Sequence, residues 1–309
     1  MLTRKTVVLA KIETAYGTDP VPTASADAIA VQDLEIRPTG DLVERNSLKD
    51  SLSPLGILQG AKRVDLSFKT EAKGTGTPGV LPVRGWEGVL FRACGMSETV
   101  NADTNIVYAP VSAGFESCTL YVYRDRLFHK VTGCRGSFRI AAEAGKPVMV
   151  EWKFKGCYLS PTDAAPGVPV FGILLPPIAA GAGFTVGDYS PVTEKLEIDI
   201  NNTLAERKNI AAQNGIAGFE ITGRKPRGSF ESEAVAEATH PFWNNWENGT
   251  ALALSLTVGT AAGNRFRIEA PAIQYSEIGY ADRDGRAVYR VPFLLAMNDG
   301  DDELTITVM

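Results

Sequence analysis

The sequence predicts a mainly β protein made of two tandem units, each a twisted antiparallel β-sandwich or half-barrel with one packed α-helix. Three observations support this prediction. A residue pattern repeats after 162 positions, apolar and polar residues alternate in several segments, and a proline- and glycine-rich stretch separates the two halves. Period-two alternation is typical of strands with one buried face. We therefore expect an N-terminal arm over 1–30, a first unit over 31–158, a connector over 159–192 and a second unit over 193–309.

The repeat starts with Leu34-Glu35-Ile36, which reappears as Leu196-Glu197-Ile198. Internal repeats of this kind reveal architecture before any local structure is assigned. Near the end of each half, Gly145-Lys146 corresponds to Gly285-Arg286 at the smaller spacing of 140, so the second unit is about 22 residues shorter in its middle. Other residues that keep the spacing of 162 are Leu42, Glu44, Arg45, Ser67 and Phe68, matched by Leu204, Glu206, Arg207, Ser229 and Phe230.

The alternating segments give the strands and the predicted core. Val64, Leu66 and Phe68 alternate with polar residues, and 148–154 and 196–200 behave in the same way. The apolar residues of these segments should face the inside of the sandwich. The predicted sheet core is Leu34, Ile36, Phe68, Trp152, Phe154, Leu196, Ile198 and Phe230.

Each unit is also expected to contain one helix, over Gly85 to Ala93 in the first unit and roughly over Ala234 to Trp246 in the second. In the first helix, Trp86 and the apolar residues that follow it lie on one face. The dipeptide Asp284-Gly285 predicts a β-hairpin, because glycine tolerates a positive φ. The connector lacks either periodicity, and we expect its segment 171–175 to dock against the protein or a neighbouring subunit.

Composition excludes several classes of function. The 36 acidic and 31 basic residues give a net charge of -5, with no Lys/Arg stripe that would grip nucleic-acid phosphates. The apolar run after Arg4 and Lys5 is too short for a signal peptide, and no transmembrane segment is expected. Because no CxxC spacing occurs, the four cysteines are expected to be reduced, as in a cytoplasmic protein.

The sequence offers little for catalysis or for metal binding. The two histidines, His129 and His240, stand outside any cluster with metal-ligand spacing. The segment 74–79 fits GxGxxG literally, but Pro78 disrupts the helix start that would hold a pyrophosphate. We therefore expect no cofactor, no metal and no enzymatic activity.

Several segments resemble the major tail tube proteins of long-tailed bacteriophages, especially those of Mu-like siphophages. They are Leu9 to Pro20, Leu34 to Ile36 with Glu44-Arg45, Lys62 to Phe68, and Gly156 to Tyr158. The resemblance implies a structural virion protein that polymerises into stacked rings, forming the conduit for DNA ejection. It also implies assembly in the host bacterial cytoplasm, tail terminator and tail-tip proteins as partners, and a lumen through which the tape measure protein and DNA pass.

A conduit for DNA should not bind DNA tightly, since each phosphate contact adds affinity through counterion release. The lumen is therefore expected to lack basic clusters and to lean acidic. The polar faces of the predicted strands supply the candidates, with Arg63, Lys69 and Lys153 among them, although the same face could be an outer solvent-exposed surface. The candidate lumen residues are Asp33, Glu35, Asp65, Glu151, Glu197, Asp199 and Glu231.

Segments 43–60 and 205–223 are expected to be equivalent long loops, and the resemblance implies that such loops contact the neighbouring ring. The candidate stacking residues are Ser47, Leu48, Lys49, Asp50, Leu52, Pro54, Ile210, Gln213 and Asn214.

Most proteins of this class carry one tube unit and form six-membered rings, whereas two units per chain suggest a ring of three chains. A six-chain ring stays open as an alternative, as does a tail-tip, baseplate hub or adaptor protein. Tyr121, Tyr123, Trp243 and Trp246 are the aromatic residues on which a carbohydrate-binding module would depend. A hydrolase would have to rely on strand-borne acids such as Glu35 and Glu151.

Overall fold

The computed structural model describes residues 2, 4–81 and 88–309. Within these residues it contains three short helices and twenty strands, and all strand pairings are antiparallel. The prediction of a mainly β, antiparallel protein is confirmed. The elements are β1 (Thr6–Ile12), α1 (Ala24–Asp27), β2 (Ala28–Ile29), β3 (Gln32–Val43), β4 (Leu58–Glu71), α2 (Gly88–Ala93), β5 (Met96–Asn101), β6 (Asn105–Pro110), β7 (Cys118–Arg124), β8 (Leu127–Glu143), β9 (Met149–Tyr158), β10 (Thr162–Asp163), β11 (Gly183–Val186), β12 (Thr193–Asp199), β13 (Asn202–Lys208), β14 (Ile216–Arg224), β15 (Arg227–Glu233), α3 (Phe242–Glu247), β16 (Leu252–Val258), β17 (Phe266–Tyr275), β18 (Gly279–Arg283), β19 (Arg286–Ala296) and β20 (Thr305–Val308).

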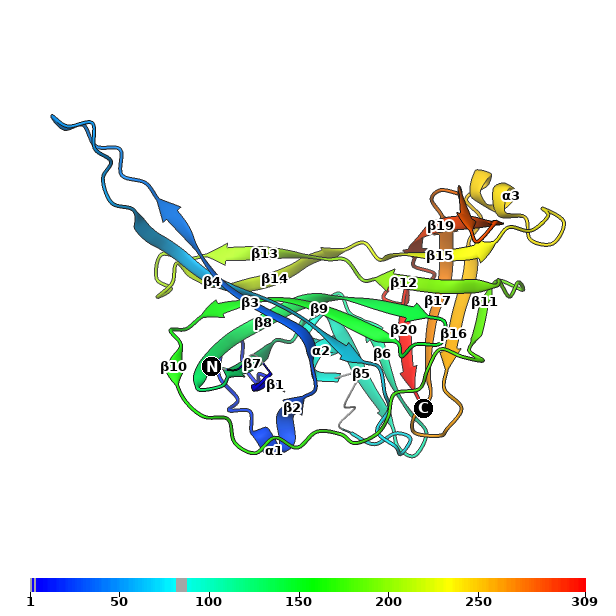
Figure 1. Cartoon of the computed structure of the whole chain (residues 1–309), viewed down its shortest axis with the longest axis horizontal. Coiled ribbons are helices and arrows are strands. Elements are labelled where there is room, and N and C mark those ends of the chain that lie inside the picture. The colour runs from blue at the N-terminus through cyan, green and yellow to red at the C-terminus, as the bar shows by residue number, and fades with distance from the viewer. Residues whose placement is uncertain (1, 3, 82–87) are drawn as a thin grey trace.

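One layer of the protein is a sheet that runs through both halves of the sequence. Its strands follow in the order β3, β4, β9, β8, β12, β15, β19 and β18. The two halves meet where β12 pairs with the second half of β8 (Figure 1). Apolar and polar residues alternate along these strands because one face of the sheet is buried and the other is polar.

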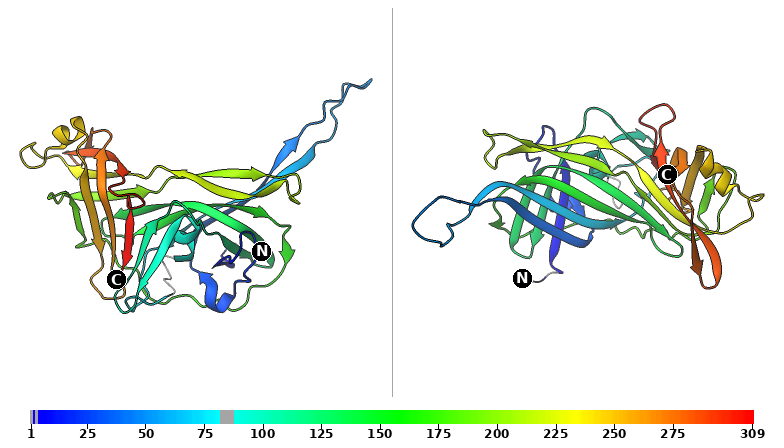
Figure 2. Two further views of the ribbon diagram at one scale, coloured as in Figure 1. Left: turned by 180° about the vertical axis from the view of Figure 1, so that it is seen from behind. Right: turned by 90° about the horizontal axis from the view of Figure 1, so that it is seen from above.

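The second layer is formed by two further groups of strands. In the first half, β2, β1 and β7 extend from the first part of β8. In the second half, β11, β16 and β17 continue through the C-terminal β20 to β6 and β5 from the first half. The two halves therefore share strands in both layers and pack as one body (Figure 2).

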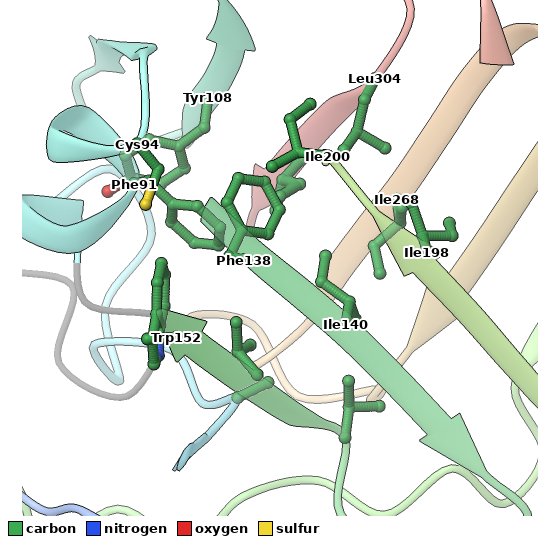
Figure 3. Close-up of a cluster of buried hydrophobic side chains, with 14 of the residues drawn as sticks. Phe91, Cys94, Tyr108, Phe138, Ile140, Trp152, Ile198, Ile200, Ile268 and Leu304 are labelled. Carbon is green, nitrogen blue, oxygen red and sulfur yellow. The ribbon is translucent and has the colours of Figure 1, made fainter. Parts of the chain in front are cut away.

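The core between the layers is continuous across the junction of the two halves. Phe91 on α2 packs edge-on against Phe138 and Trp152, with ring centroids 4.8 and 4.9 Å apart. The indole N–H of Trp152 donates a 2.9 Å hydrogen bond to Thr70, so this buried donor is satisfied. Figure 3 shows the cluster continuing to Ile140 on β8 and Ile198 on β12. Burial of this apolar surface is the main force that holds the halves together.

The helices are shorter than predicted. In the first half, α2 covers only the end of the predicted helix, and Trp86 lies outside the described residues. The prediction for the second half was wrong over 234–241, where the chain forms a turn and helix α3 begins after Pro241. Proline disfavours helical φ and ψ at the residue before it, which explains the late start. The predicted hairpin at Asp284-Gly285 is confirmed, since both residues have positive φ and the turn joins β18 to β19.

The connector between the halves runs along the side of the molecule opposite β13 and β14 (Figure 1). It is fixed at intervals: Ala24 O accepts from Val170 N, and Leu175 O accepts from the side chain of Asn264. Its apolar side chains remain largely outside the core, with Ile173 97% and Leu175 79% exposed. Within the described part of the chain, no helix is long and apolar enough to cross a membrane.

Candidate functional site: the polar sheet face, the arms and the free edges

The polar face of the sheet brings together candidate lumen residues from both halves. A groove of about 680 Å³ on this face is lined by Glu35, Asp65, Glu151 and Asp199. The remaining candidates, Asp33, Glu197 and Glu231, lie on β3, β12 and β15 of the same sheet. These acids are placed by period-two alternation, which puts them opposite the buried apolar side chains of their own strands.

Basic residues alternate with the acids on this face. Lys69 lies 2.8 Å from Asp33, Lys153 lies 3.2 Å from Glu151, and Arg290 lies 2.9 Å from Glu231. These pairs are exposed, so each contributes little to stability. Their effect is on the surface potential, because Lys and Arg side chains are interspersed with the candidate acids and make the face a mosaic of charges of both signs. Such a mosaic presents little net charge to a polyanion.

The junction between the halves carries its own ion pair. Arg139 on β8 contacts Glu197 on β12, and Lys195 lies 2.6 Å from the same carboxylate. Burial acts to raise the pKa of Glu197, but the hydrogen bonds from Lys195 and Arg139 outweigh it and hold that pKa below its usual value. The backbone register at the junction runs from Lys195 opposite Glu143 to Asp199 opposite Arg139.

The sheet ends in two free edges. Among the residues that the structure describes, β3 pairs only with β4, and β18 pairs only with β19. A free edge exposes unpaired N–H and C=O groups and is a template for pairing with another chain. The carbonyl oxygen of Leu34 on β3, for example, accepts a 3.3 Å hydrogen bond from the Arg124 side chain rather than from a strand backbone.

The first predicted loop is the tip of an arm. The outer parts of β3 and β4, with residues 44–57 between them, project away from the body (Figure 1). Leu48 and Leu52 at the tip are fully exposed, and Leu42, Ile57 and Leu58 are more than half exposed. Exposed apolar side chains in such a cluster mark a contact surface. Ser47, Lys49, Asp50 and Pro54 are exposed in the same tip.

The second predicted loop is mostly the hairpin β13–β14, which contacts β4, β8 and β9 instead of projecting. Only its tip is a loop, in which Ile210 is fully exposed, Gln213 is exposed and Asn214 is partly buried. Asn214 in this tip donates a 2.6 Å hydrogen bond from Nδ2 to Tyr158 O, and its carbonyl accepts from Lys62 N. This hairpin, residues 202–224, is the second arm, and it is therefore bound to the first half of its own chain.

Residues that sequence reasoning missed hold this second arm in place. The hydroxyl of Tyr16 donates to Gly133 O at 2.9 Å and accepts from Phe219 N at 2.7 Å. Arg135 donates a 3.0 Å hydrogen bond to Phe219 O and lies over the Tyr16 ring. These contacts join positions about 80 to 200 residues apart, so no periodicity or local motif could have indicated them.

The predicted core residues lie between the two layers. Phe68, Trp152, Phe154, Leu196, Ile198 and Phe230 are buried, whereas Leu34 and Ile36 on the free edge strand β3 are only partly buried. The histidines lie apart from each other: His240 is buried against Tyr275, with Nε2 3.0 Å from its hydroxyl, and His129 is on β8. Within residues 2, 4–81 and 88–309, no group of three His, Cys, Asp or Glu side chains could hold a metal ion.

Comparison with known proteins gives one family. No curated protein matches the chain. A family model described as phage tail tube protein matches residues 3–293, which is nearly the whole sequence. The match spans both halves, both arms and both free edges of this antiparallel β protein. The chain therefore belongs to the phage tail tube protein family and is a structural component of the virion tail.

Proposed function

We propose that three copies of this chain close one ring of the tail tube, and that stacked rings form the conduit for DNA ejection into the host. The observation that carries the proposal is the β8–β12 junction. In this junction, β12 of the second half pairs with β8 of the first half. β3 and β18, which remain free at the two ends of the sheet, could pair between chains in the same way.

The strand order supports two equivalent units. The series β3, β4, β9, β8 is followed by β12, β15, β19, β18, with the same antiparallel pairings in each. Ile36 faces Leu66 in the first series, and Ile198 faces Gly228 in the second, which preserves the spacing of 162 on both strands. A register shift follows the first residue of both β3 and β12. Six such units, two from each of three chains, would give a wall with sixfold-like symmetry.

Ring closure gives the free edges a role. Head-to-tail contacts form a closed ring when the rotation per unit closes. A closed barrel of strands removes every free edge. Without closure, the polar backbone groups of β3 and β18 would stay available for uncontrolled pairing.

The polar face supports its assignment to the lumen. Asp33, Glu151 and Glu231 are each paired with a Lys or Arg side chain, so part of the positive charge on this face is neutralised before it could meet DNA. Replacing Glu35 and Asp65 by Lys should let tubes assemble but make them retain DNA at low salt, with release as salt rises. Unchanged DNA retention by assembled variant tubes would place this face on the outside.

The deciding experiment is a reconstruction of the assembled protein by electron microscopy. We expect tubes with three chains per ring and strands from both units in the inner wall. Six chains per ring, with one unit lining the tube and the other decorating it, would contradict the proposal. Single rings that never elongate would indicate a tail-tip or hub protein instead.

A further inference from the structure

We infer that β3 of one subunit pairs antiparallel with β18 of the next, with Asp33 opposite Arg283, and that the charges at this position prevent wrong pairing between units. The inference rests on the proposed function, because it specifies the contact that closes the ring. It concerns a surface of this chain and a partner that is a second copy of it.

The register follows from the junction inside the chain. Leu66 opposes Phe154 and Gly228 opposes Phe293, so Phe293 occupies in β19 the place of Phe154 in β9. Three residues before each of them, Glu151 opposes Arg139 and Arg290 opposes Gly279. Gly279 in β18 thus corresponds to Arg139 in β8.

The register of the internal junction gives the register expected between the two free edges. In that junction, Lys195 opposes Glu143 and Asp199 opposes Arg139. A spacing of 162 converts β12 to β3, and a spacing of 140 converts β8 to β18. The resulting pairs place Asp33 opposite Arg283, Glu35 opposite Ala281, Ile36 opposite Tyr280, and Arg37 opposite Gly279.

Burial differs between the paired and the free edges as this register requires. At the internal junction, Ile198 and Ile140 are 1% and 2% exposed. At the free edges, Ile36 is only partly buried, and Tyr280 is 69% exposed beside Trp243, with ring centroids 5.7 Å apart. Adding β3 of a neighbour to β18 would set Ile36 against Tyr280 and cover this apolar edge.

At the end of the paired strands that lies nearest the β8–β9 or β18–β19 turn, the two opposed charges have opposite signs in the two junctions. The internal junction places Lys195 opposite Glu143, whereas the junction between subunits would place Asp33 opposite Arg283. Both combinations are complementary. The two wrong combinations are not, because β12 against β18 would oppose Lys195 to Arg283, and β3 against β8 would oppose Asp33 to Glu143. Like charges directly opposite each other destabilise a strand pair.

This reversal gives each edge one correct partner. Without it, β8 of one chain could accept β3 of another, which would exchange units between chains and produce open or branched assemblies. In the isolated chain these two side chains have local partners: Lys69 lies 2.8 Å from Asp33, and Glu194 lies 3.2 Å from Arg283. Arg283 also lies 3.6 Å from Glu233 and is partly exposed, and Asp33 is exposed, so both charges could exchange partners during assembly.

Cysteine cross-linking tests the register. Directly opposed residues in antiparallel strands have Cα atoms about 4.5 to 5.5 Å apart, which is within disulfide range. A chain carrying only Glu35→Cys, mixed with a chain carrying only Ala281→Cys, should form disulfide dimers upon oxidation during assembly. The matched control replaces Ala281→Cys by Gly279→Cys, two residues away, and should cross-link at least tenfold less. Wild-type protein treated in the same way controls for the four native thiols.

The outcomes separate the inference from the proposed function. Three-chain rings without the Glu35→Cys to Ala281→Cys link, or with a stronger link to Gly279→Cys, would overturn the register while leaving the ring intact. Absence of rings in the wild-type protein would instead count against the proposed function.

Charge reversal tests the specificity. Asp33→Lys or Arg283→Asp alone should weaken ring formation roughly fivefold per interface, and the double variant should recover it. Asp33 has a positive φ of 52°, at which lysine is strained. The double variant carries the same strain and the loss of both local pairs, with Lys69 and Glu194, so recovery, meaning a loss smaller than the sum of the two single losses, would isolate the charge effect. No recovery, with both single variants folded by circular dichroism, would refute the charge argument.

Discussion

Truncation of two corresponding isoleucines should separate the stability of the chain from the stability of the ring. Ile198 on β12 is 1% exposed and packs in the core at the junction with β8 (Figure 3). Its counterpart Ile36 on β3 is partly buried at a free edge. The two side chains are chemically identical, so any difference in the effect of truncation reflects what covers them.

The expected magnitudes follow from burial. Truncation of a fully buried isoleucine to alanine costs about 2–5 kcal/mol, so Ile198→Ala should lower the free energy of unfolding by about 3 kcal/mol. Ile36→Ala removes less buried surface and should cost about 1 kcal/mol in the isolated chain. For a chain of this size, 1 kcal/mol corresponds to roughly 2 °C in Tm. The expected losses are about 6 °C for Ile198→Ala and about 2 °C for Ile36→Ala.

Assembly should show the opposite order. Ile36→Ala should raise the protein concentration needed for rings, measured by sedimentation velocity, because in the proposed ring it removes an apolar contact with β18 of the neighbouring subunit. Ile198→Ala, kept below its Tm, should assemble almost normally. Equal Tm losses for the two variants, or normal assembly of Ile36→Ala, would refute the idea that the free edge is buried in the ring.

Three further predictions concern the arms and the junction. Deleting Ser47 to Pro54 should leave Tm nearly unchanged yet stop elongation into tubes in electron micrographs, and normal tube growth would show that the exposed tip is not a stacking contact. Tyr16→Phe removes one hydrogen bond to Phe219 of the second arm and one to Gly133 of β8 and should cost about 1–3 kcal/mol, with faster amide hydrogen exchange at Phe219. Exchange unchanged at that amide would contradict the role of the hydroxyl. The lowered pKa of Glu197 means that the ion pair with Arg139 stabilises the fold above the unfolded pKa of about 4.3, and that this contribution is lost as pH falls through the folded pKa. Melting curves should show a smaller loss of Tm below pH 4 for Arg139→Met than for the wild type.

Local patterns in the sequence predicted much of the fold. Alternation placed Phe68, Trp152 and Phe230 on the inner sides of their strands because side-chain direction along a strand depends only on residue parity. Asp284-Gly285 predicted its hairpin because the turn needs positive φ at both residues. Helix boundaries were less predictable, as shown by the late start of α3 at Phe242, since Pro241 overrode the apolar pattern before it.

The sequence by itself determined the strand class, the repeat spacing and the polar face, because each depends on neighbours along the chain. Only the tertiary structure decided that β12 pairs with β8, that β3 and β18 remain free, and that the second arm lies on its own chain while the first projects. The two predicted loops, 43–60 and 205–223, carry the same Glu-Arg pair near their start, and no local signal distinguishes them. The two arms differ because a contact between distant residues depends on the whole packed chain. The second arm contacts Tyr16 and Arg135 of the first half, whereas the tip of the first arm, residues 44–57, projects away from the body (Figure 1).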